Sequence, residues 1–220
     1  MPTEGEKGAA IYNPFVLRIY DLCVLGFSNS YAWGCPTKSV LKPFYRQHLG
    51  RRHLDIGVGT GYFLQDIPKD IDLTLIDLNP NALETARRRS GRESVKCIQH
   101  DVTQPLPEDQ LHSEQFDSIA LFYLFHCVPG GSQKVQLLRR LKPYLAEGGV
   151  VYGATVLGQG VQHNFIGRLL LALYNRKGIF SNWDDSQEMF ENELRQHFDK
   201  VETKLVERVL LFSASGPKKT

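Results

Sequence analysis

The sequence predicts a three-layer α/β domain with a sheet of about seven strands, and three observations support this prediction. Short apolar runs alternate with helical stretches between residues 53 and 155, which is typical of a parallel sheet covered by helices on both faces. Closely spaced glycines follow the first of these runs, where a buried strand must turn sharply. The chain then ends on two nearly contiguous β-rich runs, which we expect to form an antiparallel pair that completes the sheet.

The N-terminal segment reads as a helical cover for the sheet. Residues 11–50 suggest two or three helices, with breaks near Asn29 and at 34–36, where glycine and proline occur together. We expect residues 11–215 to form a single domain that includes this cover. Residues 1–10 are predicted to be disordered and residues 216–220 to form a loose tail, because both ends are small and polar.

Three short apolar runs predict the first half of the sheet, at 53–57, 73–77 and 95–99. Between the second and third runs, residues 81–89 read as a helix. Asn79 and Pro80 mark its start, because proline is favoured at the first helical position.

The second half of the sheet is predicted from strands at 116–122 and 150–155. A helix is expected over 134–145, stopped by Gly148 and Gly149. An apolar helix over 161–175 and another helix over 185–197 should follow, before the final strands at 200–207 and 208–213.

Composition limits the classes of partner. The 220 residues carry a formal charge of only +2, which is too small to predict a nucleic-acid or acidic-membrane partner from the overall field. No apolar run is long enough to span a bilayer, and the start lacks the apolar core of a signal peptide. Four cysteines without a C-x-x-C pair predict neither a zinc site nor disulfides. We therefore expect a cytoplasmic protein.

The most informative segment is the glycine loop after the first predicted strand. Gly57, Gly59 and Gly61 would let the backbone turn tightly and approach a ligand closely. Asp77 ends the next strand 20 residues after Gly57, where an acidic group can accept hydrogen bonds from ribose hydroxyls. The spacing is G-x-G-x-G, so the dinucleotide fingerprint G-x-G-x-x-G fails at its third glycine. Asp55 puts an anion beside the loop, which suits a ligand with an ammonium group better than a pyrophosphate.

Residues 55–61 resemble the first motif of the class I S-adenosylmethionine-dependent methyltransferases, and the resemblance extends over about residues 50–215. It implies a Rossmann-like methyltransferase fold with S-adenosylmethionine as the cofactor. It also implies a set of cofactor contacts. Asp55 would anchor the methionine part, the three glycines would line it, Asp77 with Leu78 would hold the ribose, and Asp101 with Val102 would lie at the adenine.

Methyltransferase subclasses differ at the end of the fourth strand, here residues 121–130. The Asn/Asp-Pro-Pro-Tyr element of base and glutamine N-methyltransferases is absent, as is the glutamate pair of protein arginine methyltransferases. No carboxylate lies there to hold Mg²⁺, so we predict no metal. The segment resembles the apolar-His-x-x-Pro-Gly variant of small-molecule enzymes. His126 is then a candidate general base; alternatively, it hydrogen-bonds the backbone or shapes the pocket.

Two covers are expected to close the pocket. In the N-terminal cover, Tyr20 resembles an element that touches the cofactor in such enzymes, and Trp33 is a candidate substrate contact. His163, near the start of the apolar helix at 161–175, is a second substrate-side candidate. The alternative for these residues is simple packing. An apolar helix at this position favours an apolar or aromatic acceptor.

These features predict a methyltransferase that acts on a small apolar or aromatic molecule, with O-methylation in secondary metabolism as the leading hypothesis. A methyltransferase-like cyclase or pericyclase, which binds the cofactor without methylating, is the alternative. A non-catalytic partner of a larger methyltransferase is disfavoured, because the glycine motif is complete.

Overall fold

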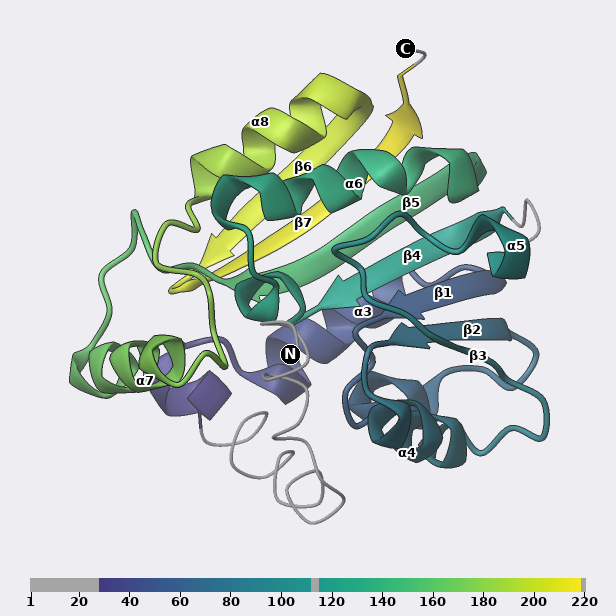
Figure 1. Ribbon diagram of the computed structural model, residues 1–220, viewed down its shortest axis with the longest axis horizontal. Coiled ribbons are helices and arrows are strands. Elements are labelled where there is room, and N and C mark those ends of the chain that lie inside the picture. The colour runs from purple at the N-terminus through teal and green to yellow at the C-terminus, as the bar shows by residue number, and fades with distance from the viewer. Residues whose placement is uncertain (1–27, 112–114, 219–220) are drawn as a thin grey trace.

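The computed structural model describes residues 28–111 and 115–218. Its centre is one seven-stranded sheet in the order β3-β2-β1-β4-β5-β7-β6 (Figure 1). The first five strands along the chain run parallel, and β7 pairs antiparallel with both β5 and β6. The strand bounds are β1 (Arg52–Ile56), β2 (Asp72–Asp77), β3 (Lys96–Gln99), β4 (Phe116–Phe122), β5 (Leu145–Val156), β6 (Phe198–Val206) and β7 (Val209–Pro217). The predicted seven-stranded fold with its antiparallel end is confirmed.

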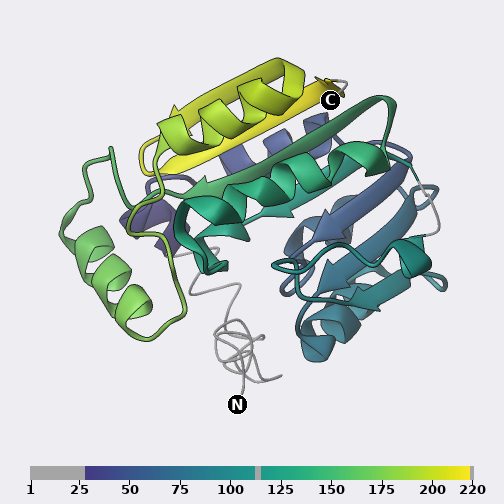
Figure 2. The same ribbon diagram turned by 45° about the horizontal axis from the view of Figure 1, so that its top comes forward.

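Helices cover both faces of this sheet (Figures 1 and 2). Apolar side chains of α5, α6 and α8 pack with one buried cluster, and those of η2, α3, η3, α4 and α7 pack with the other. The helical bounds are η2 (Thr37–Leu41), α3 (Lys42–Gln47), η3 (Tyr62–Asp66), α4 (Pro80–Ser90), α5 (Glu108–Leu111), η4 (Phe125–Cys127), η5 (Gly131–Val135), α6 (Gln136–Arg140), η6 (Lys142–Tyr144), α7 (Phe165–Arg176) and α8 (Gln187–His197).

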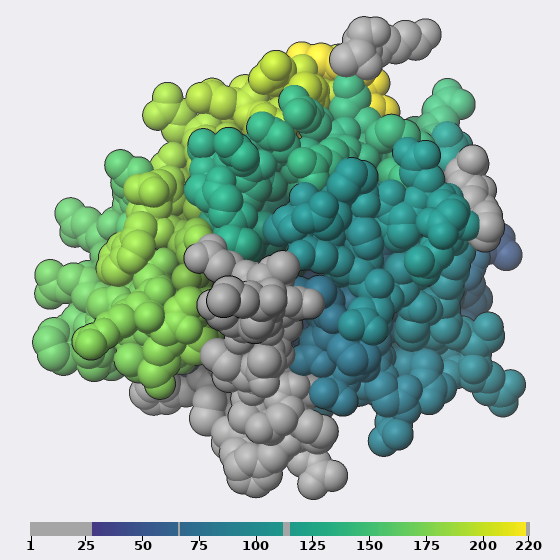
Figure 3. Space-filling view, viewed as in Figure 1, coloured from purple at the N-terminus to yellow at the C-terminus, as the bar shows by residue number. Residues whose placement is uncertain are grey.

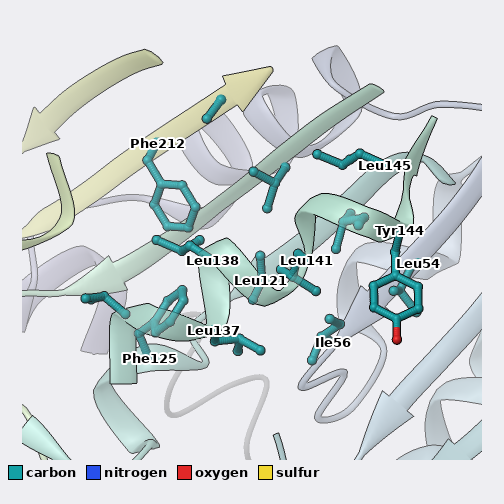
Figure 4. Packing of buried hydrophobic residues seen from close by; sticks show 14 of the residues in the cluster. Leu54, Ile56, Leu121, Phe125, Leu137, Leu138, Leu141, Tyr144, Leu145 and Phe212 are labelled. Carbon is teal, nitrogen blue, oxygen red and sulfur yellow. The ribbon is translucent and has the colours of Figure 1, made fainter. Parts of the chain in front are cut away.

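The first core cluster joins the α6 region to the sheet. Leu137, Leu138 and Leu141 lie against Leu121 of β4 and Phe212 of β7 (Figure 4). Most of β4 is buried, and β7 begins with the buried apolar run 209–212, as expected for strands covered on both faces. This packing fixes the end of β4, where the chain turns toward the site.

Helix α4 follows the sequence prediction closely. It begins at Pro80, and the side chain of Asn79 accepts a hydrogen bond from the Asn81 amide at 2.9 Å. It ends at Gly91, whose φ of 61° is the left-handed conformation that favours glycine after a helix.

Other boundaries differ from the predictions. The helix expected over 134–145 is divided into η5, α6 and η6, because the turns on either side of α6 tighten into 3₁₀ geometry. Pro143 is the second residue of η6. Gly148 and Gly149 lie inside β5 and do not end a helix. The predicted loose tail is also shorter, because β7 continues to Pro217, which pairs with Phe198. The predicted N-terminal disorder lies outside the described residues.

The sheet order creates a topological switch point. From β1 the chain moves outward to β2 and β3, and β4 then returns to the other side of β1. Ligands of open α/β sheets bind in the crevice at the carboxyl ends of the strands beside such a point. Within residues 28–111 and 115–218, no helix is long and apolar enough to cross a membrane.

Candidate cofactor and acceptor site

A pocket with about 870 Å³ of empty space, part of it open to solvent, lies at the carboxyl ends of β1, β2 and β4. The loops after β1, β2 and β3 bring six of the predicted cofactor residues to its lining: Gly57, Gly59, Asp77, Leu78, Asp101 and Val102. Tyr20, the remaining candidate from the N-terminal cover, lies outside the described residues.

A smaller hollow of about 450 Å³ adjoins this pocket. The two share Gly57, Gly59 and Tyr123 in their linings, and the smaller one is also lined by Asp55 and Gly61. The predicted cofactor residues within the described chain therefore gather around two connected spaces. Such a shape suits an elongated ligand with chemically different ends.

The glycine loop passes close to both spaces. Gly59 has a φ of +51°, and a Cβ atom placed on it would meet nothing within 4 Å. Glycine is favoured there by the backbone conformation, and the open space lies where a ligand can approach. At Gly61, a Cβ atom would lie 2.6 Å from the Cα of Ala86, so this glycine lets the loop pack directly on α4.

The loop amides hold the carboxylate of Asp77 in place. One oxygen accepts a hydrogen bond from the Asn79 amide at 2.8 Å, and the other accepts from the Gly59 amide at 3.2 Å. Burial raises the pKa of Asp77 to about 6, against these hydrogen bonds, which lower it. The side chain is therefore mostly ionised at neutral pH and fixed at the pocket wall.

Asp55 is a more deeply buried acid, with 5% of its surface exposed. Its Oδ2 accepts a hydrogen bond from the Tyr45 hydroxyl at 2.9 Å. Burial, with a smaller contribution from the negative charge of Asp77, raises its pKa to about 7 against the effect of this hydrogen bond. A ligand cation nearby would favour the ionised form. The site thus fits a ligand that carries an ammonium group at this end, as S-adenosylmethionine does.

Asp101 forms the third acidic position. Its Oδ1 accepts hydrogen bonds from both the amide and the hydroxyl of Thr103, at 2.9 and 2.8 Å. This turn holds Asp101 and Val102 at the pocket lining.

His126 lies beside the pocket, but its side chain is not among those that line either space. It is 3% exposed, and its ring centroid lies 4.4 Å from that of Phe180. Its Nδ1 lies 3.4 Å from both the Val156 amide and the Thr155 hydroxyl. Burial, with a smaller contribution from the charge of Lys134, lowers the pKa of His126 to about 3. These contacts favour the shaping alternative over a general base.

Trp33 and His163 pack together next to the site. Trp33 is 1% exposed, and its ring lies 6.1 Å from His163 and 6.0 Å from Phe180. Neither Trp33 nor His163 lines the pocket. The structure therefore favours the packing alternative for both. Instead, Ile179, which follows α7, reaches the lining. Figure 3 shows this α7 region (green) on the opposite side of the molecule from the segments around β2 and β3 (blue).

Tyr123 is a site residue that the sequence analysis did not select. It follows directly after β4, lines both spaces and has a φ of +57°. A left-handed conformation at a tyrosine is uncommon, and such strain concentrates at functional sites. Its position at the end of β4 was the available signal, although the nearby His126 carries the more readily titratable side chain.

Residues 54–151 match the model of a protein family that is described as "Methyltransferase domain". This range begins in β1 and ends in β5, so it contains the glycine loop, Asp77 and Asp101. It does not include α7, Ile179 or the antiparallel strands.

Relatives match nearly the whole chain. The "Physcion biosynthesis cluster O-methyltransferase" of Aspergillus chevalieri is 46% identical over 219 residues, which cover 98% of each chain. The "Putative uncharacterized protein YbcY" of Escherichia coli strain K12 is 48% identical over 196 residues, which cover 88% of this chain and all of its own. The solved DhpI–SAH complex has a TM-score of 0.66 at 18% identity and covers 97% of this chain and 98% of its own, which shows a shared fold.

Proposed function

The chain belongs to the class I S-adenosylmethionine-dependent methyltransferases, and on this premise we propose that it methylates a hydroxyl oxygen of a small, largely apolar or aromatic molecule. The observation that carries the proposal is the Aspergillus chevalieri relative, which is named an O-methyltransferase of a biosynthesis cluster and aligns over 98% of both chains. We accordingly place the activity in secondary metabolism.

The residues of the two spaces have distinct roles in this proposal. S-adenosylmethionine supplies an electrophilic methyl group on its sulfonium. Asp55 would pair with the cofactor ammonium, Asp77 would accept hydrogen bonds from the ribose hydroxyls, and Asp101 with Val102 would hold the adenine. Each acid lines one of the two spaces, and Asp77 and Asp101 are oriented by neighbouring amides.

The acceptor would lie against the apolar side of the larger pocket. Leu124, Val128 and Ile179 line this side, and together they present little polar surface to an acceptor. An apolar wall excludes water and orients the acceptor hydroxyl toward the methyl group, and such positioning supplies a large part of a transfer rate. Because the pKa of His126 is about 3, it would be a weak proton acceptor at neutral pH. We propose that it supports the pocket wall through Phe180 and Thr155.

The test is a methylation assay. The purified protein is incubated with S-adenosylmethionine and a panel of phenols and small apolar alcohols, and products are followed by mass spectrometry and NMR. We expect a gain of one CH₂ in mass, a methyl group on oxygen, and one S-adenosylhomocysteine per product. A methyl group on nitrogen or carbon would contradict the proposal. Conversion of an acceptor at unchanged mass would favour the cyclase alternative.

A further inference from the structure

A buried chain of hydrogen bonds runs behind the glycine loop and ends at Asp55. The Gly50 amide donates to the Ser118 hydroxyl at 2.8 Å, and this hydroxyl lies 2.7 Å from Nδ1 of His53. Nε2 of His53 lies 2.8 Å from the Tyr45 hydroxyl, which donates to Asp55 at 2.9 Å. The side chains of Ser118, His53 and Tyr45 are fully buried.

The fold explains how these side chains meet. His53 and Asp55 are two residues apart on β1, so their side chains lie on the same face of the sheet. Ser118 is directly opposite His53 on the parallel neighbour β4. Tyr45 comes from α3, which covers this face, and its hydroxyl reaches both β1 side chains.

The hydrogens of this chain can be assigned in a single direction. A tyrosine hydroxyl has one hydrogen, so when Tyr45 donates to the Asp55 carboxylate it must accept from Nε2–H of His53. Nδ1 of His53 is then an acceptor for the Ser118 hydroxyl, which itself accepts from the Gly50 amide. Every donor thus points toward Asp55, and burial keeps the ring neutral by lowering the pKa of His53 to about 3.

We propose that Tyr45 and His53 are positioning residues that act through Asp55, holding its carboxylate ionised and oriented for the ammonium group of the cofactor. When Asp55 takes up a proton, the side-chain hydrogen bonds reverse: Asp55 donates to Tyr45, and Tyr45 donates to Nε2 of His53. His53 then takes the Nδ1–H tautomer and donates to the Ser118 hydroxyl, which turns its own hydrogen away from the ring while still accepting from the Gly50 amide. The tautomer of His53 therefore reports the charge of Asp55. The inference rests on the role proposed above for Asp55.

Other charged and titratable groups surround this chain. The charge of Asp77 on β2 raises the pKa of Asp55, and the charge of Asp55 raises the pKa of Tyr152 on β5. The charge of Arg92 acts to lower the pKa values of Tyr45 and His53. Tyr152 provides a matched control. Its ring lies 5.8 Å from that of Tyr45 in the same buried cluster, and its hydroxyl makes no hydrogen bond within the described residues.

The experiment measures S-adenosylhomocysteine binding by calorimetry between pH 6 and 9 for wild type, Tyr45→Phe and Tyr152→Phe. Loss of the Tyr45 hydrogen bond should raise the pKa of Asp55 from about 7. A rise of about one unit lowers the ionised fraction at pH 7 roughly fivefold and has almost no effect at pH 9. We therefore expect Tyr45→Phe to bind about fivefold more weakly at pH 7 and nearly normally at pH 9, with Tyr152→Phe close to wild type throughout. Equal effects of both variants, or an effect of Tyr45→Phe that does not depend on pH, would overturn the inference.

A second measurement uses the wild-type protein, so it does not depend on the folding of a variant. The ¹⁵N NMR shifts of the His53 ring should show the Nε2–H tautomer above pH 8. As the pH is lowered, they should move toward the Nδ1–H tautomer, with the same midpoint as the pH dependence of S-adenosylhomocysteine binding. Added S-adenosylhomocysteine should restore Nε2–H at pH 6. A tautomer that stays constant across this range would refute the relay. If S-adenosylhomocysteine binds and no acceptor is methylated, the proposed function fails and the relay stands.

Discussion

Asp77 is the residue whose contacts most directly connect the glycine loop to the pocket. Its two oxygens bind amides of the β1 and β2 loops, and the carboxylate faces the larger space. We expect Asp77→Ala to weaken S-adenosylmethionine binding about 10- to 100-fold, because hydrogen bonds to charged groups are worth about 1.5–3 kcal/mol. Calorimetry at pH 8 checks this. Asp72→Ala, at the exposed start of the same strand, is the control and should bind normally; equal affinities for both variants would exclude the ribose role.

His126 illustrates how burial converts a titratable side chain into a determinant of stability. Its pKa is about 3 in the folded protein and about 6.5 when unfolded, so the unfolded chain takes up a proton first as the pH falls. The contribution of neutral, buried His126 to the free energy of unfolding is therefore present in full above pH 6.5 and is lost as the pH falls toward 3.

We therefore expect the stability advantage of wild type over His126→Asn to shrink by about 1.4 kcal/mol per pH unit below 6.5, or about 2 kcal/mol by pH 5. Urea unfolding at pH 7, 6 and 5 measures the difference directly, since contributions common to both proteins cancel. A constant advantage over this range would mean that His126 has the same pKa in the folded and unfolded protein.

At the scale of elements, a comparison of Gly59 in the glycine loop with Gly148 distinguishes the effect of backbone strain from that of ligand contact. Gly59 and Gly148 both have left-handed backbones, at +51° and +75°, and both face open space. Alanine at either position should cost about 1–2 kcal/mol of stability. Only the Gly59 methyl would project into the pocket lining. We expect Gly59→Ala to weaken S-adenosylhomocysteine binding more than tenfold and Gly148→Ala to leave it unchanged, in paired denaturation and calorimetry; similar binding by both would contradict the placement of the ligand at the loop.

The elements also show which features the sequence could predict. Features that depend on local patterns could be predicted. These are strands β1 and β2, the cap of α4, and the gathering of Asp55, Asp77 and the glycines. The helix expected over 134–145 was divided because helix length is set by how α6 packs between β4 and α8, which is a tertiary effect.

Side-chain direction was harder to predict than strand position. The pattern near the end of β4 selected His126 because of its chemistry, yet the turn after Phe122 brings Tyr123 into the lining and buries His126 under Phe180. Trp33 and His163 face each other for a similar reason, because segments distant in sequence meet there. Such contacts have no local signal in a single sequence.

At the scale of the whole molecule, the sheet order places the pocket between two groups of strands. The end of β1, the end of β2 and the loop after β3 supply Asp55, Asp77 and Asp101 on one side. The segments after β4 and α7 supply Val128 and Ile179 on the other. The family match covers residues 54–151, so it contains the first side and leaves out Ile179 and α7.

This division has an evolutionary consequence. Under the proposed roles, a substitution on the α7 side would alter which acceptor is admitted without disturbing any carboxylate proposed to hold the cofactor, so new specificities would arise one mutation at a time in a protein that remains active. Substitutions that change acceptor choice are therefore expected in the segments around 124–129 and 158–183. A lineage of such proteins can diversify its products while conserving its methyl donor.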